Sequence, residues 1–498
     1  MKLTRSGSRR GRARRYATSL LPPPVSLLVV VCLCSFTGCG GMTAVGGPGI
    51  LAPRVSEAQE IRAGQRAAGD ASRAIGLVAD QALQDYVQQV GARLAAASER
   101  PDLSWTFRIL DDPMPNAFAL PGGYVFVTRG ILAVVSSEAE LAGVLAHAIG
   151  HVSARHGVQA LGRQSGAQLG VWAVAVPALR SLDGDASAGA GLLFAGHSAA
   201  AERQADDLGF RYMLAAGYDV RELPDLLAAL ARLDAMGGRS ALASWLTTHP
   251  DPGERVDTAA RRAGAVQEPL ESFRQNRSEY LEQIEDLVYG EDPRQGFFRG
   301  SRFVHPELRF RLDLPGGWRY RNLSQVVVAT SPDGHAAIQA TIVEKVSPAE
   351  AAERFLGQPG VSGTGEVSPE TVHGNLAVFA PFRVSTGARA AAGLAAWIDY
   401  GGRTYQLVGL AESQAANGHA EEFRDAFRSF GPATDARLLD VRPNRINIVR
   451  LGRATTFEDF NRRYPSVVDA EEVALLNRVS GGRSRLRAGG RMKRVVKG

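Results

Sequence analysis

The stretch Glu138-Ala-Glu-Leu-Ala-Gly-Val-Leu-Ala-His147-Ala-Ile-Gly-His151 decides the fold of the central part of this chain. Ser136-Ser137 comes directly before it, and serines followed by early glutamates are typical of a capped helix start. Apolar residues then recur at helical spacing, which predicts a helix through His151. His147 and His151 are four residues apart, so both imidazoles project from one helix face and can bind one cation. Such a pair is also often structural, and the pair alone leaves both interpretations open.

A second helix is predicted from Ala199 to Ala215, and it carries the motif Glu202-Arg-Gln-Ala-Asp206. Glu202 offers a carboxylate as a third ligand. Asp206, one turn further on, can hold a histidine N–H and so orient a ligand. Two histidines and one glutamate with an open fourth position are the arrangement of catalytic zinc.

The segments around these two helices predict a mainly helical domain with a small sheet. Ile61 to Ala97 has apolar residues at helical spacing and is expected to lead in as a helix. Trp105 to Leu110 and Tyr124 to Thr128 are expected to be short strands, the second entered through the turn Leu120-Pro-Gly-Gly123. A further helix is expected from Leu223 to Met236.

Between residues 60 and 260 the sequence resembles the gluzincin metallopeptidases of the CAAX-prenyl-protease and HtpX type, most closely their bacterial periplasmic branch. Several separated motifs carry this resemblance, in the family's order. They are Asn116-Ala-Phe-Ala-Leu-Pro-Gly-Gly123, His147-Ala-Ile-Gly-His151 with Arg155-His156, Glu202-Arg-Gln-Ala-Asp206 with Gly209, Ala216-Gly217-Tyr218-Asp219, and His249-Pro250 with Arg255.

The resemblance implies a role for each matching residue. His147, His151 and Glu202 would hold zinc, and Asp206 would orient a ligand. An extended protein or peptide substrate would pair along an edge strand formed by Asn116, Ala117, Phe118, Ala119, Leu120, Gly122 and Gly123.

The resemblance also implies that His249 and Arg255 lie near the metal, where His249 would stabilise an oxyanion or take the fourth zinc position. A helix cap or a surface loop is the alternative for His249. His156 and His197 receive no ligand role and are interpreted as structural or surface residues.

One position departs from the family pattern. The motif is His-Glu-x-x-His, and its glutamate is the general base and acid of the reaction. Residue 148 is alanine, which cannot accept a proton, and Ala199 stands where many members have arginine three residues before the ligand glutamate. Two interpretations follow: a protease whose site has been inactivated, or a natural pseudoenzyme that keeps its zinc.

The N-terminus is expected to be a bacterial export signal, residues 1–38. It holds seven Lys and Arg and no acid ahead of an apolar run from Val25 to Phe36, so the net charge of +6 belongs to the leader and predicts no nucleic-acid partner. Cys39 follows in a lipobox-like Phe36-Thr37-Gly38 context, which predicts a lipid-anchored protein that faces the periplasm, with the outer membrane as its site. A plain signal peptide or an uncleaved anchor is the alternative, and residues 39–55 would be a tether.

Two further modules are expected downstream of the metallopeptidase domain, residues 56–285. Residues 286–300 would be a linker, and 301–432 an α+β accessory domain, in which Leu314-Pro-Gly-Gly-Trp318 resembles the strand-turn of PsbP/Mog1-like domains. Residues 440–498 have a β-α-α-β pattern that resembles the glycan-binding LysM module, although Arg453-Ala454 replaces its usual turn.

The basic C-terminal end suggests a partner for that module. Residues 435–498 hold 15 Lys and Arg against 7 Asp and Glu, a net charge of +8. The expected partner is peptidoglycan, whose peptide stems carry carboxylates. The alternative is that this unit packs on the protease and restricts access to its cleft.

Together these features predict an α+β multidomain protein built on a mainly helical gluzincin domain. Its predicted function is that of a zinc metalloendopeptidase scaffold for quality control of exported or outer-membrane proteins, hydrolytically impaired by Ala148. The alternative is a non-catalytic zinc-binding pseudoprotease that acts as a chaperone, an adaptor or a cell-wall-binding protein.

Overall fold

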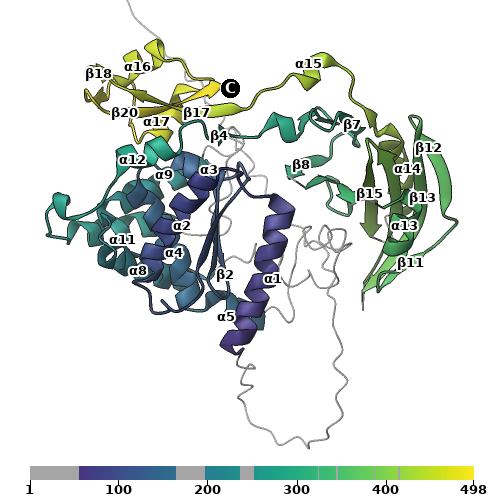
Figure 1. The fold of residues 1–498 in the computed structure, drawn as a ribbon, viewed down its shortest axis with the longest axis horizontal. Helices are drawn as coiled ribbons and strands as arrows, with labels where there is room; N and C mark the ends of the chain where they lie inside the picture. The colour runs from purple at the N-terminus through teal and green to yellow at the C-terminus, as the bar shows by residue number, and fades with distance from the viewer. Residues whose placement is uncertain are drawn as a thin grey trace, which may run out of the picture.

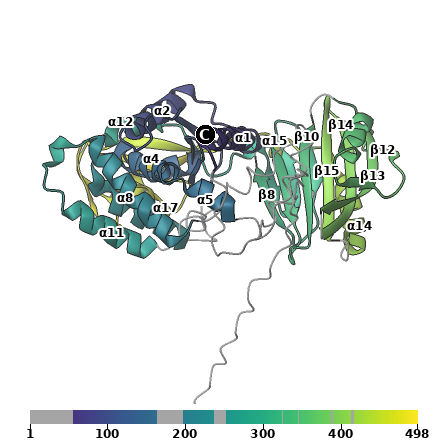
Figure 2. The ribbon, with the colours of Figure 1, turned by 90° about the horizontal axis from the view of Figure 1, so that it is seen from below.

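The structure is a computed structural model that describes residues 55–163, 197–235, 252–323, 325–343, 346–386, 389–412 and 416–498. Figure 1 shows a helical part with a small sheet and, beside it, a sheet-rich part. Figure 2 shows the same separation from a second direction. The chain then returns from the sheet-rich part to the helical part, where its last residues form a small module (Figure 1). The prediction of a mixed α and β fold, helical toward the N-terminus and sheet-rich toward the C-terminus, is confirmed at this level.

The lead-in segment forms two helices rather than the single predicted one, α1 (Glu57–Ile75) and α2 (Gln81–Ala95). Ser56 begins α1 with a capping box. Gly76 ends it with φ of 82°, a backbone conformation that favours glycine. The Asp80 side chain then caps α2. The helical periodicity was right, and the break comes from local capping chemistry.

A three-stranded sheet follows, made of β1 (Thr106–Leu110), β2 (Ala117–Leu120) and β3 (Tyr124–Thr128) in the order β1-β3-β2. β1 pairs with β3 in parallel and β2 pairs with β3 antiparallel. β2 is therefore an edge strand of this sheet. The two strands predicted from the sequence correspond to β1 and β3 and are confirmed. Gly122 and Gly123 turn the chain from β2 to β3 with φ of 81° and 97°.

Helices make up the rest of this part, and α4 is the central one. Every residue of α4 from Glu138 to Val152 is buried, and Ser137 caps its start as predicted.

In the described ranges no helix is long and apolar enough to cross a membrane. The other elements of the helical part are α3 (Arg129–Val134), α4 (Glu138–Ser153), α5 (His156–Arg163), α8 (Ala199–Ala215), η1 (Val220–Glu222), α9 (Leu223–Ala235), α11 (Pro252–Gly264), η2 (Leu270–Ser272) and α12 (Arg277–Gln283).

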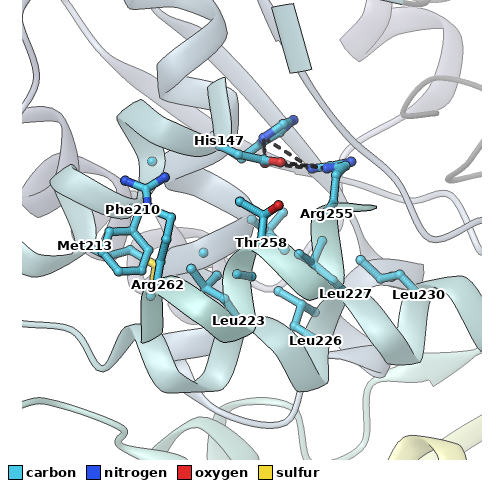
Figure 3. A pocket seen from close by; sticks show the side chains of 15 residues that line it. His147, Phe210, Met213, Leu223, Leu226, Leu227, Leu230, Arg255, Thr258 and Arg262 are labelled. Carbon is cyan, nitrogen blue, oxygen red and sulfur yellow. Dashed lines mark hydrogen bonds and ion pairs between the residues drawn. The ribbon is translucent and has the colours of Figure 1, made fainter. Parts of the chain in front are cut away.

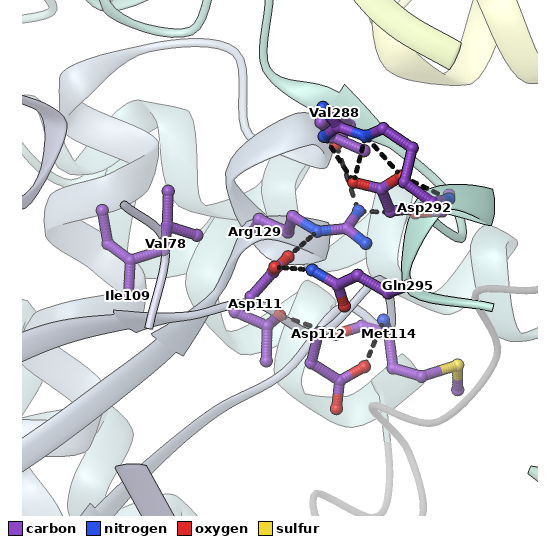
Figure 4. Close-up of polar contacts among 12 residues, drawn as sticks. Val78, Ile109, Asp111, Asp112, Met114, Arg129, Val288, Asp292 and Gln295 are labelled. Atoms are coloured by element: carbon purple, nitrogen blue, oxygen red, sulfur yellow. Dashed lines mark hydrogen bonds and ion pairs between the residues drawn. The ribbon is translucent and has the colours of Figure 1, made fainter. Parts of the chain in front are cut away.

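Residues 286–300, predicted as a linker, contain β4 (Val288–Tyr289), η3 (Pro293–Gln295) and β5 (Phe297–Arg299). Buried Arg129, at the start of α3, holds this segment against the first sheet (Figure 4). Its guanidinium contacts the Asp111 carboxylate at 2.5 Å and donates to the carbonyl oxygen of Gly290, also at 2.5 Å. Gln295 donates to the same carboxylate at 2.6 Å. The connection is therefore anchored by buried polar contacts.

The accessory part is antiparallel, with an eight-stranded sheet in the order β11-β13-β14-β15-β10-β9-β8 plus β12 on β13, and a four-stranded sheet β16-β7-β6-β5. Helix α13 packs on one face of the large sheet through Phe355 and Trp397, and α14 packs on the other through Phe423 and Ile398. The bounds are β6 (Arg302–His305), β7 (Phe310–Asp313), β8 (Arg319–Leu323), β9 (Val326–Thr330), β10 (Ala336–Val343), α13 (Pro348–Leu356), β11 (Val361–Gly363), β12 (Ser368–Val372), β13 (Asn375–Thr386), β14 (Arg389–Tyr400), β15 (Arg403–Glu412), α14 (Ala416–Ser429) and β16 (Gly431–Pro432).

The C-terminal module has the predicted β-α-α-β order and is fused to the helical part. Its strand β17 pairs with β20 on one side and with β4 on the other. Ile446, Leu475 and Val495 belong to the same hydrophobic core as α4. The elements are α15 (Ala436–Leu439), β17 (Asn444–Arg450), β18 (Thr455–Thr456), α16 (Phe457–Arg463), α17 (Ala470–Leu476), β19 (Arg485–Leu486) and β20 (Arg491–Lys497). The module is thus not an appendage on a flexible tether.

Buried Lys493 on β20 joins the module to the end of α3. Its side-chain nitrogen donates to the carbonyl oxygens of Ala133, Val134 and Val135 at 2.9, 3.1 and 2.9 Å. These carbonyls belong to the last residues of α3 and to its C-cap, which have no acceptor role within the helix. Burial lowers the pKa of Lys493 well below its ordinary value, while the three acceptors favour the ammonium form, which has one N–H group for each of them. One lysine therefore completes a helix end that lies more than 350 residues away in sequence.

We expect Lys493→Met to destabilise the protein by about 2–4 kcal/mol, because it leaves three buried carbonyls without their donor. Lys497→Met is the matched control, since Lys497 lies exposed on the same strand. Urea unfolding followed by circular dichroism measures both. Equal stability of the two variants would contradict the capping role.

Candidate metal centre

Two glycines allow α4 and α8 to approach closely enough to form a metal site. A Cβ atom on Gly150 would lie 2.8 Å from the carbonyl oxygen of Ala205, and one on Gly209 would lie 3.0 Å from the backbone nitrogen of His147. Glycine avoids both collisions, so the two helix backbones meet where α4 carries the histidines and α8 carries Glu202. Side chains from residues far apart in the sequence are thereby brought to one point.

His147, His151 and Glu202 form the cluster that the sequence predicted. All three are buried, and one ligand atom from each lies within 4.8 Å of the others. The two Nε2 atoms are 3.1 Å apart, and the Glu202 carboxylate oxygens lie 3.5 Å from that of His147 and 3.4 Å from that of His151. Ligands of a tetrahedral zinc with bonds of about 2.0–2.1 Å are separated by about 3.3 Å. The donor set and its spacing therefore fit zinc.

Asp206 and Arg255 hold the outer nitrogen of His147. The Asp206 carboxylate lies 2.8 Å from Nδ1 of His147, and Arg255 donates to both of its oxygens at 2.8 Å. Arg255 also lies 3.4 Å from Glu202. The structure thus brings Asp206 and Arg255 together beside the cluster, as the sequence predicted. The contacts fix the ring so that Nε2 faces the cluster.

These contacts set the protonation states. Burial by itself would lower the pKa of His147, but the Asp206 and Glu202 carboxylates outweigh it and raise that pKa above the ordinary value. Burial lowers the pKa of His151 well below the ordinary value, with Glu202 opposing it and His147 lowering it further. His151 therefore presents a neutral imidazole at neutral pH, which is the form that binds a metal.

Two histidines that received no ligand role adjoin the cluster. Buried His156 places its Nδ1 3.0 Å from that of His151 and its Nε2 3.1 Å from Gln204. The His197 ring stacks on His151 at a centroid distance of 4.0 Å. The interpretation of His156 as structural or surface is refined by its place behind a ligand. In the sequence, only its spacing of five residues from His151 pointed to this contact. No sequence feature pointed to the contact with Gln204.

An apolar pocket lies beside the contacts of His147, Asp206 and Arg255, enclosed by α4, α8, α9 and α11 (Figure 3). Its walls include Phe210, Met213 and several leucines of α9. His147 and Arg255 lie at one edge, and Arg262 lies beside Phe210 (Figure 3). Apolar walls strengthen the electrostatic contacts that they border, because little water competes for them.

Other predicted residues fall in different places. Ala148 is buried on α4 between the two histidines, and a methyl group stands at the position of the family's base. Ala199 is the first residue of α8. β2, the predicted substrate strand, packs against α4. One of its edges pairs with β3, and the opposite edge pairs with no strand of this sheet. His249 and Cys39 lie outside the described residues.

Comparison with known proteins supports the reading of this site. The model of Peptidase family M48 matches residues 81–263. This part of the chain is an M48 peptidase domain. It contains α4, α8 and the His-His-Glu cluster.

Relatives of the M48 domain have been named in several organisms. The chain is 36% identical to mitochondrial metalloendopeptidase OMA1 of Schizosaccharomyces pombe over 175 residues, which are 34% of this chain and 50% of that protein. It is 30% identical to the Arabidopsis thaliana OMA1 over 199 residues, 39% of each chain. It is 29% identical to the putative beta-barrel assembly-enhancing protease of Vibrio cholerae over 197 residues, 38% of this chain and 40% of that one. The chain thus spans half or less of the relatives it matches.

Solved structures show weaker similarity. Cyanobacterial PsbP from Synechocystis is 15% identical with a TM-score of 0.24, and the match covers 27% of this chain and 95% of that one. LpqN of Mycobacterium tuberculosis is 14% identical with a TM-score of 0.18, covering 24% and 81%. Similarity at this level assigns no family to the accessory part, and its PsbP/Mog1-like character stays a prediction.

The close approach of α4 and α8 makes a stability prediction. We expect Gly150→Ala to destabilise the M48 domain by about 1–3 kcal/mol, because the new methyl group collides with the backbone of α8. Gly253→Ala is the matched control, since that helical glycine has no atom within 4 Å of the added carbon. Thermal unfolding compares the two, and an unchanged midpoint for Gly150→Ala would contradict the packing argument.

Proposed function

We propose that this protein is a zinc-binding metalloendopeptidase scaffold whose M48 domain has lost its general base. One observation carries the proposal: three buried ligand atoms lie at the spacing of tetrahedral zinc ligands, while the residue between the histidines is Ala148. The M48 match to residues 81–263 supports a peptidase origin of this arrangement.

Each residue of the cluster would have a distinct role. His147, His151 and Glu202 would hold zinc, which would polarise the scissile carbonyl as a Lewis acid. Asp206 and Arg255 would keep His147 in the orientation that presents Nε2. No side chain at position 148 accepts a proton, so the step that the family assigns to glutamate has no acceptor there. We therefore expect the chain to bind protein without cleaving it at a useful rate.

A substrate would pair along β2 as an added antiparallel strand. β2 is an edge strand that lies against α4, the helix of both histidine ligands. The Asn116 side-chain oxygen, directly before β2, is buried with no hydrogen-bond partner in the described part of the chain. Backbone pairing tolerates many side chains, which suits the quality control of misfolded or stalled exported proteins.

We expect about one zinc per purified chain, measured by elemental analysis, because the absent glutamate is not a ligand. His147→Ala should abolish binding, and Asp206→Asn should weaken it by about 10–100-fold. His419→Ala, in the accessory part, is the control. Acid should release the metal, since zinc needs His147 unprotonated and the pKa of that residue is raised. Metal-free protein at neutral pH, or zinc retained in His147→Ala, would contradict the assignment.

We expect no measurable digestion of casein by the chain as it stands, and an increase of at least about 10²-fold in Ala148→Glu, because the general base returns. Ala148→Gln is the matched control, with nearly the same side-chain volume and no proton acceptor. Zinc content verifies that both variants keep the site.

Equal inactivity of the zinc-loaded Glu and Gln variants would favour the second candidate function, a non-catalytic zinc protein that acts as a chaperone or adaptor. Ala148 is the observation that favours this candidate, and Ala199 would then be a second site of lost chemistry. Binding of an unfolded protein without cleavage, weakened by Pro substitution in β2, would support it further.

The cellular setting that we propose is the bacterial envelope, with the protein anchored through lipidated Cys39 at the outer membrane and facing the periplasm. The C-terminal module would also contact peptidoglycan. Its truncation is a poor test of this contact, because Ile446, Leu475 and Val495 belong to the core of the M48 domain.

Cys39→Ser should move the protein from the membrane fraction to the soluble fraction, because acyl chains on this residue would be its main anchor. Cell fractionation with mass spectrometry of the mature N-terminus measures this. Cys32→Ser is the matched control within the leader. Unchanged fractionation without a lipid mass shift would contradict lipidation.

A further inference from the structure

A basic cleft lies at the junction of the C-terminal module and the helical part. It has a volume of about 410 Å³. Its lining comes from the start of α12, from Leu451 directly after β17, and from residues between Arg478 and Met492. Five arginines line it and no acidic residue does: Arg277, Arg478, Arg485, Arg487 and Arg491.

Three of the five arginines already have partners within the chain. Arg478 contacts both carboxylate oxygens of Glu140, at 2.5 and 3.1 Å. Arg491 donates to the carbonyl oxygen of Ser278 and pairs with Glu282. Arg277 donates to the carbonyl oxygen of Ser136 at 3.0 Å. These contacts fix three guanidinium groups in place around the cleft.

The other two, Arg485 and Arg487, are exposed, and their guanidinium groups have no hydrogen bond or ion pair in the described part of the chain. Their backbone is nevertheless held in place. Arg485 lies on β19, which pairs with β18, and Gly489 donates to the carbonyl oxygen of Leu451 at 2.7 Å. The loop therefore presents two guanidinium groups that are available to a ligand, on a backbone held by hydrogen bonds.

Like charges gathered in one cleft repel each other unless an anion lies between them. Burial lowers the pKa of Arg277, and nearby Arg478 lowers it further against the pull of Glu140 and Glu222. The acidic residues of the chain therefore only partly offset the repulsion among the arginines and the burial of Arg277. A guanidinium matches the oxygens of a phosphate or carboxylate in a bidentate manner, so an oxyanion is the ligand that would relieve it.

We propose that this cleft binds a small oxyanion with at least two negative charges, gripped by Arg485 and Arg487 above a floor formed by Arg277, Arg478 and Arg491. Phosphate and carboxylate groups share the required chemistry. Arg478 links the cleft to the helix that carries the metal ligands, because it also pairs with Glu140 in the first turn of α4.

Isothermal titration of the full chain with pyrophosphate, and separately with citrate, tests the proposal at constant ionic strength. We expect saturable binding of at least one of the two, and a loss of at least about tenfold in the double variant Arg485→Ala/Arg487→Ala. Tight binding of pyrophosphate with weak binding of citrate would identify a phosphate site, and the reverse order a carboxylate site.

The control is Arg453→Ala/Arg483→Ala, which removes the same charge from exposed positions that do not line the cleft. This variant should change the affinity by no more than about twofold. Absence of binding to both anions, or an equal loss in both double variants, would overturn the proposal, since the second result means only a general positive field.

A neutral chitin tetrasaccharide separates this site from glycan recognition. We expect it neither to bind in the cleft nor to displace the anion. Binding of the neutral sugar that is lost in Arg485→Ala/Arg487→Ala would overturn the proposal in favour of a glycan site. None of these measurements depends on zinc or on proteolysis, so their outcome is independent of the function proposed for the M48 domain.

Discussion

The metal cluster of this protein can form because the backbones of α4 and α8 pack in direct contact. Gly150 and Gly209 remove the side chains that would keep the two backbones apart. The histidines and Glu202 can then meet at about the spacing of one metal's ligands. Because α4 is buried over nearly its whole length, it has little freedom to adjust to a changed partner, and a shift of either helix would separate the ligand atoms.

Buried charges hold α4 near both ends. Asp206 and Arg255 position His147 toward the C-terminal end, and Glu140 pairs with Arg478 of the C-terminal module at the N-terminal end. Lys493 of the same module completes the preceding helix. These groups are satisfied in pairs or networks, as burial requires. The module therefore stabilises the helix of the metal site, whatever ligand it binds.

In the function proposed above, Ala148 separates metal binding from proton transfer. Metal binding depends on three ligands and the groups that orient them, and all of these are present. Proton transfer would depend on the side chain at position 148, and that side chain is a methyl group. The contacts that orient His147 come from Asp206 and Arg255 and do not involve residue 148.

The features that rest on local periodicity and residue spacing could be predicted from the sequence alone. The i, i+4 histidines, the Ser137 cap and the Glu202 to Asp206 turn are properties of single helices, and their side-chain directions follow from helix geometry. The resemblance then supplied Arg255, whose contact with Asp206 joins residues 49 positions apart. Three contacts are visible only in the folded chain: Lys493 caps α3, Arg478 pairs with Glu140, and His156 lies against His151. The contacts of Lys493 and Arg478 depend on how the C-terminal module packs against a core made of residues hundreds of positions earlier in the chain. No local sequence pattern predicts such a long-range contact.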